Sequence, residues 1–391
     1  MDTSKLERMG RRRFMENLAG IGVSATTLQE LTRDELTDVT HDPEEEIPYV
    51  AAWKNVGRAE DGTVQREPVY ETISRERWER KEATDNALQQ VGEFLEGRGE
   101  DHTLVFTGAE HSPTEYGIEV KTTPEKRDRI EKILPTEQQG IATADGETVR
   151  DVEVPVDVVS TELQKQADNY DGEHYDEIPG AAPVARVVEP EEWVAGTATA
   201  PFHSDEHGDG WVMSGHVASG NGEDIVHQLD DTIDTVDLGT SRDQINSGFR
   251  DCAFIESDTY RIPSSWIPSE DYNDPKDISI DGTVTDEGLE NRVGQNYGLT
   301  MQGRYSGRHD TTLTGVIKGG LLGQDVKALV ADYNDTVDGD SGGPVFHQLS
   351  EGAYICGAHT GTYDSDDDNV YEDSVSTTAE TVEEELGGNF I

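Results

Sequence analysis

A serine set among glycines stands out in a chain dominated by acidic residues. Residues 339–344 read Gly-Asp-Ser-Gly-Gly-Pro. A serine hydroxyl attacks a carbonyl only when a base takes its proton and donors hold the oxyanion that forms. Flanking glycines let the backbone turn consecutive N–H groups inward, because they tolerate dihedral angles that other residues avoid. The motif therefore predicts a nucleophile, Ser341, with the N–H groups of Gly339 and Ser341 as the oxyanion hole.

The base for this serine has to come from another segment. Residues 210–219, GWVMSGHVAS, form an apolar, strand-like run ending in small residues and His216, which predicts an imidazole at a strand end with little steric cover. Residues 249–256, FRDCAFIE, place Asp251 at the start of an apolar strand. A buried carboxylate there would hold the imidazole in its reactive tautomer and stabilise the imidazolium. The pattern indicates a Ser-His-Asp triad.

In chain order, His216, Asp251 and Ser341 resemble the triad of the chymotrypsin family of serine peptidases, with GDSGGP around the serine and Asp-x-Ala-Phe-Ile after the second position. The resemblance covers residues 179–391 and implies a double β-barrel with the triad in its cleft. It makes His216 the general base, Asp251 its orienting partner and Ser341 the nucleophile. It implies protein or peptide substrates.

Two features depart from that family. Ser214-Gly215 replace the usual pair of alanines before the histidine, and the cysteines that commonly brace the histidine and serine loops are absent. The chain contains Cys252 and Cys356 only. Buried free thiols are favoured, and a disulfide between them stays open.

The same resemblance places a substrate pocket. Asp335 stands where trypsin-like enzymes carry the aspartate that attracts Arg or Lys. Thr336 and His359 stand where glutamyl endopeptidases place a hydroxyl and a histidine, and Thr360 and Gly361 continue that strand. A histidine and a hydroxyl can bind a carboxylate by charge-assisted hydrogen bonds. Acidic specificity is favoured, and basic specificity through Asp335 remains the alternative.

Beyond residue 178 the chain consists of short extended runs separated by Gly, Asp, Asn and Ser, such as GLTMQG, TGVIKG and AYICGAHT. Many short strands with turn signals between them predict an all-β sandwich or barrel. Residues 376–388, STTAETVEEELGG, are the one helical pattern there. The fold class expected for 179–391 is all-β with a C-terminal helix.

Residues 33–178 differ in pattern. Helical spacing predicts helices over residues 74–97 and 123–134, and extended runs cover 103–108, 116–122 and 152–160. This composition predicts a small α+β N-terminal unit that ends near Ile178. It carries no recognisable chemistry, and we expect either a propeptide that assists folding or blocks the cleft, or a permanent domain.

Residues 1–32 contain Arg11-Arg12-Arg13-Phe14 before a short, weakly apolar run from Leu18 to Ala25. A basic block before a brief apolar segment is typical of a signal peptide, and the paired arginines resemble a twin-arginine export signal. This implies the twin-arginine translocase as a partner and an extracellular location. The alternative is a basic N-terminal helix of a cytosolic protein.

The charge balance narrows the partners. Acidic residues outnumber basic ones 82 to 31, for a formal net charge of −51. Such a surface repels nucleic acid and anionic membranes, and no apolar stretch is long enough to span a bilayer. The acidic residues lie in segments that also keep an apolar periodicity, which is typical of a folded chain. At molar salt, where the Debye length is about 3 Å, its self-repulsion is screened. The sequence thus resembles proteins of halophilic archaea, although an acidic mesophile protein remains open.

Two motifs are declined as metal sites. Asp364, Asp366 and Asp368 are spaced like a calcium loop, but Asn369 and Val375 stand where such a loop needs glycine and glutamate. His203 and His207 could ligate a metal, but nothing else in the sequence supports such a site. We therefore expect no metal and no cofactor.

Together these patterns predict a secreted serine endopeptidase, made as a zymogen, that hydrolyses peptide bonds through an acyl-enzyme. The first rival is a catalytically idle homologue that binds peptides or a partner. The second is a quality-control peptidase held at the cell surface. The intact triad favours the enzyme.

Overall fold

The computed structural model describes most of the chain from residue 46 onward. The described ranges are 46–59, 62–100, 102–108, 115–144, 147–160, 162–164, 178–189, 192–228, 235–257, 263–268, 278–320, 324–332, 339–349, 352–364 and 371–391. The expected export segment, 1–32, and the pocket candidates Asp335 and Thr336 lie outside them.

A closed barrel of six strands follows Ile178. Its strands are β8 (Pro183–Glu189), β9 (Glu192–Ser204), β10 (Gly208–Met213), β11 (Asp224–Gln228), β12 (Thr235–Ser247) and β13 (Arg250–Ser257). The barrel closes because β10 pairs with both β9 and β13, while β11 pairs with both β8 and β12. Trp211, Val184 and Ile225 lie in its core.

A second closed barrel of six strands completes the C-terminal part. It consists of β16 (Gly298–Gly303), β17 (Gly307–Gly320), β18 (Gln324–Ala331), β19 (Pro344–Gln348), β20 (Ala353–Asp364) and β21 (Tyr371–Thr378). Closure comes from the pairing of β19 with both β16 and β20, and of β21 with both β18 and β20. The expected all-β double barrel is confirmed.

The C-terminal helix is also confirmed, as α9 (Ala379–Leu386). The Thr378 hydroxyl caps its first turn, and Gly387 ends it in the left-handed conformation that glycine adopts without penalty. The chain then adds β22 (Gly388–Phe390) to β9 of the first barrel. Two short helices escaped the sequence analysis: α7 (Gly215–Ala218) and α8 (Asp286–Glu290).

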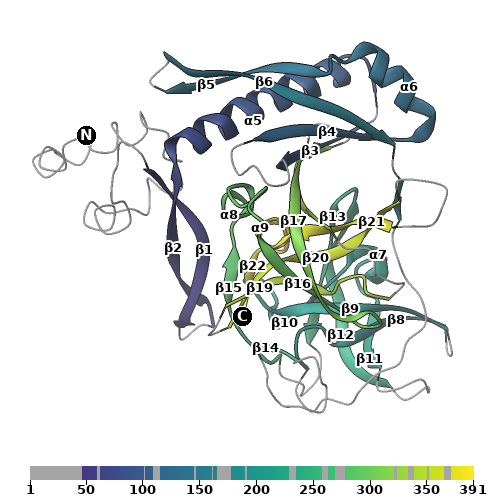
Figure 1. The fold of residues 1–391 in the computed structure, drawn as a ribbon. Coiled ribbons are helices and arrows are strands. Elements are labelled where there is room, and N and C mark those ends of the chain that lie inside the picture. Colours follow the sequence, from purple (N-terminus) through teal and green to yellow (C-terminus); the bar gives the residue numbers. More distant parts are fainter. Residues whose placement is uncertain are drawn as a thin grey trace, which may run out of the picture.

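The N-terminal unit has the expected α+β composition. It comprises β1 (Glu46–Arg58), β2 (Val64–Ser74), α5 (Arg75–Glu96), β3 (Thr103–Gly108), β4 (Tyr116–Thr122), α6 (Pro124–Ile133), β5 (Glu137–Ala144), β6 (Glu147–Ser160) and β7 (Glu162–Gln164). Helix α5 starts where the Ser74 side chain accepts a hydrogen bond from the Arg77 N–H and ends at Gly97. It packs on β5 and β6, at the top of Figure 1. The hairpin of β1 and β2, and strand β5, were not predicted.

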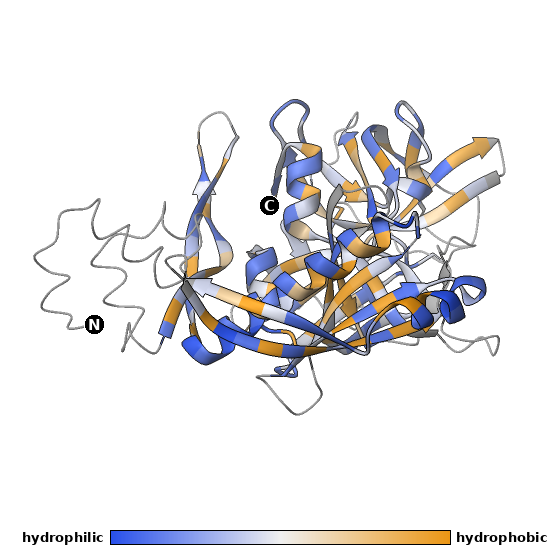
Figure 2. Ribbon diagram, turned by 90° about the horizontal axis from the view of Figure 1, so that it is seen from above, coloured by the Kyte–Doolittle hydropathy of each residue, from blue (hydrophilic) through white to orange (hydrophobic). Residues whose placement is uncertain are grey.

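This unit is not separate from the barrels. Strand β3 pairs with β17, and β1 pairs with β15 (Ile278–Val284). Strand β15 also pairs in parallel with β20 and in antiparallel with the small strand β14 (Trp266–Ile267). One sheet therefore runs from the N-terminal unit into the second barrel. Figure 2 shows apolar and polar residues alternating along its long strands, as one buried face requires.

Candidate active site

His216 and Asp251 meet on neighbouring elements of the first barrel. Helix α7 follows β10, and Asp251 stands near the start of β13, which pairs with β10. The His216 Nδ1 lies 2.6 Å from the Asp251 Oδ2, and the His216 backbone N–H donates to the Asp251 Oδ1 at 2.8 Å. The carboxylate is fully buried, and the imidazole is 10% exposed. One carboxylate therefore fixes both the backbone and the ring of His216, with Nε2 directed away from it.

The expectation that His216 ends a strand was wrong. It lies in a single helical turn, α7, which is separated from the end of β10 by Ser214 alone, and Ser219 closes this turn at a φ of +65°. Gly215 makes the turn fit, since a Cβ there would lie 1.8 Å from the Ile245 carbonyl oxygen on β12. That contact leaves no room for a side chain at position 215.

Ser341 lies in a tight turn that both barrels hold. The Ser341 carbonyl accepts from the Thr197 N–H on β9 at 2.8 Å, and the Thr197 hydroxyl donates to the Gly339 carbonyl at 2.9 Å. On the other side, the Gly342 N–H donates to the His359 carbonyl on β20 at 2.8 Å. Ser341 is fully buried. The turn thus lies at the junction of the two barrels.

The acidic neighbour of the serine has a structural role. The Asp340 Oδ1 accepts from the Tyr305 N–H at 2.8 Å and from the Ser306 N–H at 3.2 Å. These bonds tie the serine turn to the connection between β16 and β17. They satisfy the backbone N–H groups of Tyr305 and Ser306, which would be costly to bury without an acceptor.

Two glycines of the motif are required by space and backbone angle. Gly342 has a φ of +91°, and a Cβ there would lie 2.0 Å from the Thr197 carbonyl oxygen. At Gly343 a Cβ would lie 2.7 Å from the Gln302 carbonyl oxygen. Gly339, at a φ of +98°, turns the chain into the motif. The signature therefore reflects close backbone packing around Ser341.

The serine and histidine loops touch each other. The Ser214 hydroxyl donates to the His359 carbonyl at 3.0 Å, and a Cβ on Gly342 would lie 3.1 Å from the Ser214 backbone nitrogen. Ser214 is two residues before His216, and Gly342 directly follows Ser341. The structure therefore brings the three predicted triad members to one place between the barrels.

His359 lies on β20 beside this junction and is fully buried. Burial, with the nearby His216 as a second cause, lowers the pKa of His359 to about 3, so its imidazole is neutral near pH 7. Its Nδ1 lies 3.4 Å from the Ser374 Oγ, whereas its Nε2 is buried without a hydrogen-bond partner in the described part of the chain. An unpartnered buried nitrogen is a natural contact for a ligand atom.

The sequence analysis missed a second such group. Ser376 on β21 pairs in register with His359, and its hydroxyl is likewise buried without a partner among the described residues. Directly paired residues of neighbouring antiparallel strands carry their side chains on the same face. The alternation of serines at 374 and 376 on β21 was the available signal. The other predicted pocket residues lie on β20, next to His359. The Thr360 hydroxyl already has a partner, the Thr377 hydroxyl at 3.1 Å, and Gly361 pairs with Val375 of β21.

Thr377 was also missed. Its Oγ1 accepts from the Asp251 N–H at 3.3 Å and donates to the Phe249 carbonyl. A hydroxyl of the second barrel thus holds the backbone on both sides of Arg250, at the start of the first-barrel strand β13 that carries Asp251.

Strand β7 pairs with the C-terminal end of β20. Gln164 pairs with Thr362 and Leu163 pairs with Tyr363, in antiparallel register. This places the end of the N-terminal unit on the same strand that carries His359.

The declined metal candidates have separate partners. His203 Nδ1 lies 2.7 Å from the Asp209 Oδ1, and His207 Nε2 lies 3.2 Å from the Asp243 Oδ2. Among the described residues, no group of three or more His, Cys, Asp or Glu side chains is placed to hold a metal ion. Cys252 and Cys356 are buried free thiols, and burial raises the pKa of each. None of the helices in the described ranges is long and apolar enough to cross a membrane.

No protein-family model and no curated protein sequence matches the chain. Solved structures resemble it over about half its length. They include a chymotrypsin of Cellulomonas bogoriensis (12% identity, 55% of this chain and 98% of that one, TM-score 0.38) and protease A of Thermobifida fusca (14%, 55% and 98%, TM-score 0.38). A third is a glutamic-acid-specific serine protease described as using a histidine triad in substrate binding (12%, 55% and 100%, TM-score 0.40).

These similarities are too low to transfer a residue's role or a substrate. The strand pairing of this chain itself defines the class of fold, which is the double β-barrel of chymotrypsin-like serine proteases.

Proposed function

We propose that the protein is a serine endopeptidase with His216, Asp251 and Ser341 as its triad. The observation that carries the proposal is the meeting of the His216–Asp251 pair, at 2.6 Å, with the glycine-flanked Ser341 turn between the two barrels. Asp251 comes from β13 and His216 from the helical turn α7, and backbone hydrogen bonds hold the Ser341 turn in place.

The chemistry follows from these positions. His216 Nε2 takes the proton from the Ser341 hydroxyl while the oxygen bonds to the substrate's carbonyl carbon. Asp251 stabilises the imidazolium, and the N–H groups of Gly339 and Ser341 receive the oxyanion. The C–N bond then breaks, and the amine leaves with the proton from His216. Water, activated by the same imidazole, hydrolyses the acyl-enzyme.

The preferred substrate has an acidic side chain before the scissile bond. His359 Nε2 and the Ser376 hydroxyl support this, as neighbouring buried donors without a partner among the described residues. An incoming carboxylate favours the charged imidazole, so it raises the pKa of His359 and draws a proton into the site. Basic specificity through Asp335 is the alternative.

The N-terminal part would serve export and latency. Residues 1–32 would direct twin-arginine export to the cell exterior, and residues 33–178 would act as a propeptide or an N-terminal domain. The pairing of β7 with β20 supports latency, because an added strand occupies an edge that an extended peptide would otherwise use.

A peptide-library digest at molar salt, with Ser341→Ala as the matched control, tests the proposal. Cleavage after Glu or Asp that vanishes in the variant supports both triad and pocket, whereas cleavage after Arg or Lys moves specificity to Asp335. If the folded protein, freed of residues 33–178, cleaves no peptide, the idle peptide-binding homologue replaces the enzyme. Cleavage that persists in Ser341→Ala refutes the assigned nucleophile.

A further inference from the structure

The contact between the N-terminal unit and the second barrel has the character of a protein interior. We propose that residues 46–164 remain bound to the barrels after the chain is cut between residues 165 and 177, so that the processed protein is a two-chain complex. This inference does not depend on the proposed peptidase activity.

Backbone pairing makes the first part of the contact. Thr107, Phe106 and Val105 of β3 pair with Gly315, Val316 and Ile317 of β17. On another side, Ala52, Trp53 and Lys54 of β1 pair with Val284, Thr283 and Gly282 of β15. Separation would leave the edges of β15 and β17 with unpaired N–H and C=O groups, which favour association.

The hydrophobic core is shared as well. One continuous cluster contains Leu104, Phe106 and Ile118 of the N-terminal unit together with Leu289 and Val316 from α8 and β17, all between 0% and 4% exposed. A face of this kind, if uncovered, would expose a large apolar patch to water. Its burial stabilises the contact in proportion to the apolar area removed from solvent.

Backbones approach each other closely at two glycines of this contact. A Cβ on Gly108 would lie 2.5 Å from the Gly294 Cα, and a Cβ on Gly288 would lie 2.1 Å from the Ala51 carbonyl oxygen. Side chains larger than hydrogen would hold the two parts apart. Such fitted approach is typical of an interior and not of a loose domain contact.

A buried ion cluster joins the two parts most specifically. Lys81 of α5 lies 2.9 Å from Glu290 of α8, and Lys318 of β17 lies 2.7 Å from Asp85 of α5. Lys318 also lies 2.8 Å from Glu290, and Lys81 lies 3.3 Å from Asp85. Each part thus contributes one cation and one anion. The Lys81–Glu290 and Lys318–Asp85 contacts cross between the parts, so separation would break both and leave each lysine with only the acidic groups of its own part.

The protonation of this cluster indicates how strongly its charges are held. Burial alone would raise the pKa of Glu290, but Lys81 and Lys318 outweigh it and lower the pKa to about 2. Burial would lower the pKa of Lys81, but Glu290 and the neighbouring acids raise it well above its usual value. Removing one partner from such a buried group is strongly destabilising.

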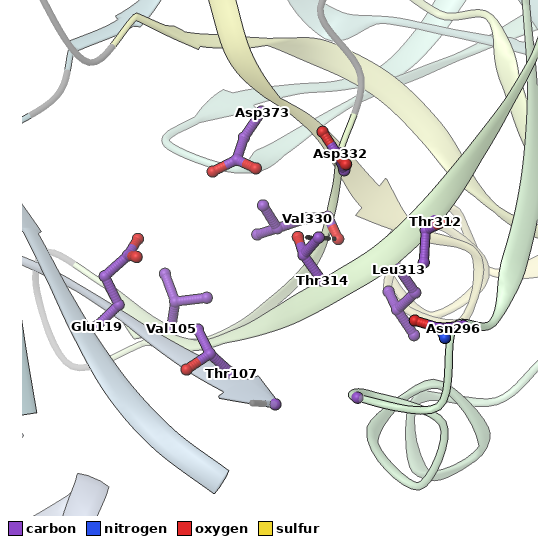
Figure 3. A pocket seen from close by; sticks show the side chains of 12 residues that line it. Val105, Thr107, Glu119, Asn296, Thr312, Leu313, Thr314, Val330, Asp332 and Asp373 are labelled. Atoms are coloured by element: carbon purple, nitrogen blue, oxygen red, sulfur yellow. Dashed lines mark hydrogen bonds between the residues drawn. The ribbon is translucent and has the colours of Figure 1, made fainter. Parts of the chain in front are cut away.

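The margin of the contact is open and acidic. A cavity of about 370 Å³ lies between β3 and β4 on one side and β17 and β18 on the other. Figure 3 shows the carboxylates of Glu119, Asp332 and Asp373 around it. Lys121 bridges this margin, at 3.2 Å from Glu119 and 2.8 Å from Asp373. Salt screens the repulsion of the remaining charge, so molar salt should favour the complex.

The test uses the full chain with Ser341→Ala, to prevent self-digestion, and a site for a sequence-specific protease in place of residues 168–174. After cutting, size-exclusion chromatography in molar salt should give one peak at the volume of the uncut protein, with two bands on a denaturing gel. Two separate peaks, each with folded circular dichroism spectra, would overturn the proposal.

A matched pair of charge reversals tests the role of the cluster. Lys81→Glu places a like charge beside Glu290, whereas Lys132→Glu makes the same change at an exposed position of α6. The cut Lys81→Glu complex should dissociate about a hundredfold more readily than the cut Lys132→Glu complex. The uncut variants, checked for cooperative unfolding, report whether each chain folds. Equal dissociation of two folded variants would remove the cluster from the interface.

Discussion

His216 makes two hydrogen bonds to one carboxylate: its backbone N–H and its Nδ1 each contact a different oxygen of Asp251, at 2.8 and 2.6 Å. The first bond fixes the helical turn α7 on β13, and the second fixes the ring. Orientation and tautomer of the imidazole therefore depend on a single buried side chain.

Asp251→Asn should keep the fold and lose activity. An amide presents one acceptor and one donor group, so it cannot accept both N–H groups as the carboxylate does. We expect kcat to fall by about 10⁴. Steady-state kinetics measures this, with Asp205→Asn, at an exposed turn, as the control of equal charge change. Loss of less than tenfold would contradict the orienting role.

Gly342→Ala should destabilise the protein more than its backbone angle alone explains. Gly222 has a similar φ, +83° against +91°, but no atom within 4 Å of its added Cβ. Gly222→Ala should therefore cost about 1–2 kcal/mol, and Gly342→Ala about 1–3 kcal/mol more. Denaturant unfolding of the two variants measures the difference. Equal losses of unfolding free energy in the two variants would show that the serine turn accommodates the added methyl group without further destabilisation.

His359 makes stability depend on pH. Its folded pKa, about 3, lies below the usual value of 6.5, so the unfolded chain binds the proton more readily. The contribution is complete above pH 6.5 and is lost as the pH falls toward 3, at up to about 1.4 kcal/mol per pH unit. Free energies of unfolding at several pH values should show a flatter dependence for His359→Gln. An unchanged slope in His359→Gln would contradict the prediction.

Thr377 positions Asp251 from the other barrel. Thr377→Val removes the acceptor of the Asp251 N–H and the donor to the Phe249 carbonyl while keeping the shape of the side chain. We expect kcat to fall about tenfold with little change in KM, which corresponds to about 1.4 kcal/mol. Thr377→Ser should restore kcat. A purely structural role would lower stability in Thr377→Val and leave kcat per folded molecule unchanged.

The catalytic residues could be predicted where each one belongs to a short, recognisable sequence pattern. GDSGGP, the histidine after an apolar run and the aspartate before another one each have a local pattern, and the structure places the three together. Most strands of both barrels followed from apolar runs between turn residues. Strands β11, β12 and β21 did not, and the helical pattern over 376–388 begins inside β21. The one-turn helix around His216 did not, because four residues are too few for a helical period.

Partners across strands were not predictable in the same way. Alternation shows that a segment is a strand, but it does not show which edge the strand meets. The pairing of β3 with β17 joins residues more than 200 positions apart, and no local pattern reports it. Ser376 was not predicted for the same reason, because its importance comes from its pairing with His359. Thr377 was not predicted because its importance comes from its contact with Asp251. The close contact of Gly215 with Ile245 was equally hidden.

Strand β22 adds to β9 of the first barrel from residues that are synthesised long after that barrel. Phe390 is fully buried and pairs with Phe202 of β9, and its carbonyl accepts from the Asn55 side chain of the N-terminal unit. The order of synthesis and the order of folding are therefore opposed: the first barrel is complete as a chain segment long before its sheet can be finished. Contacts between such distant positions raise the contact order, which slows folding. We expect this chain to fold after synthesis rather than during it.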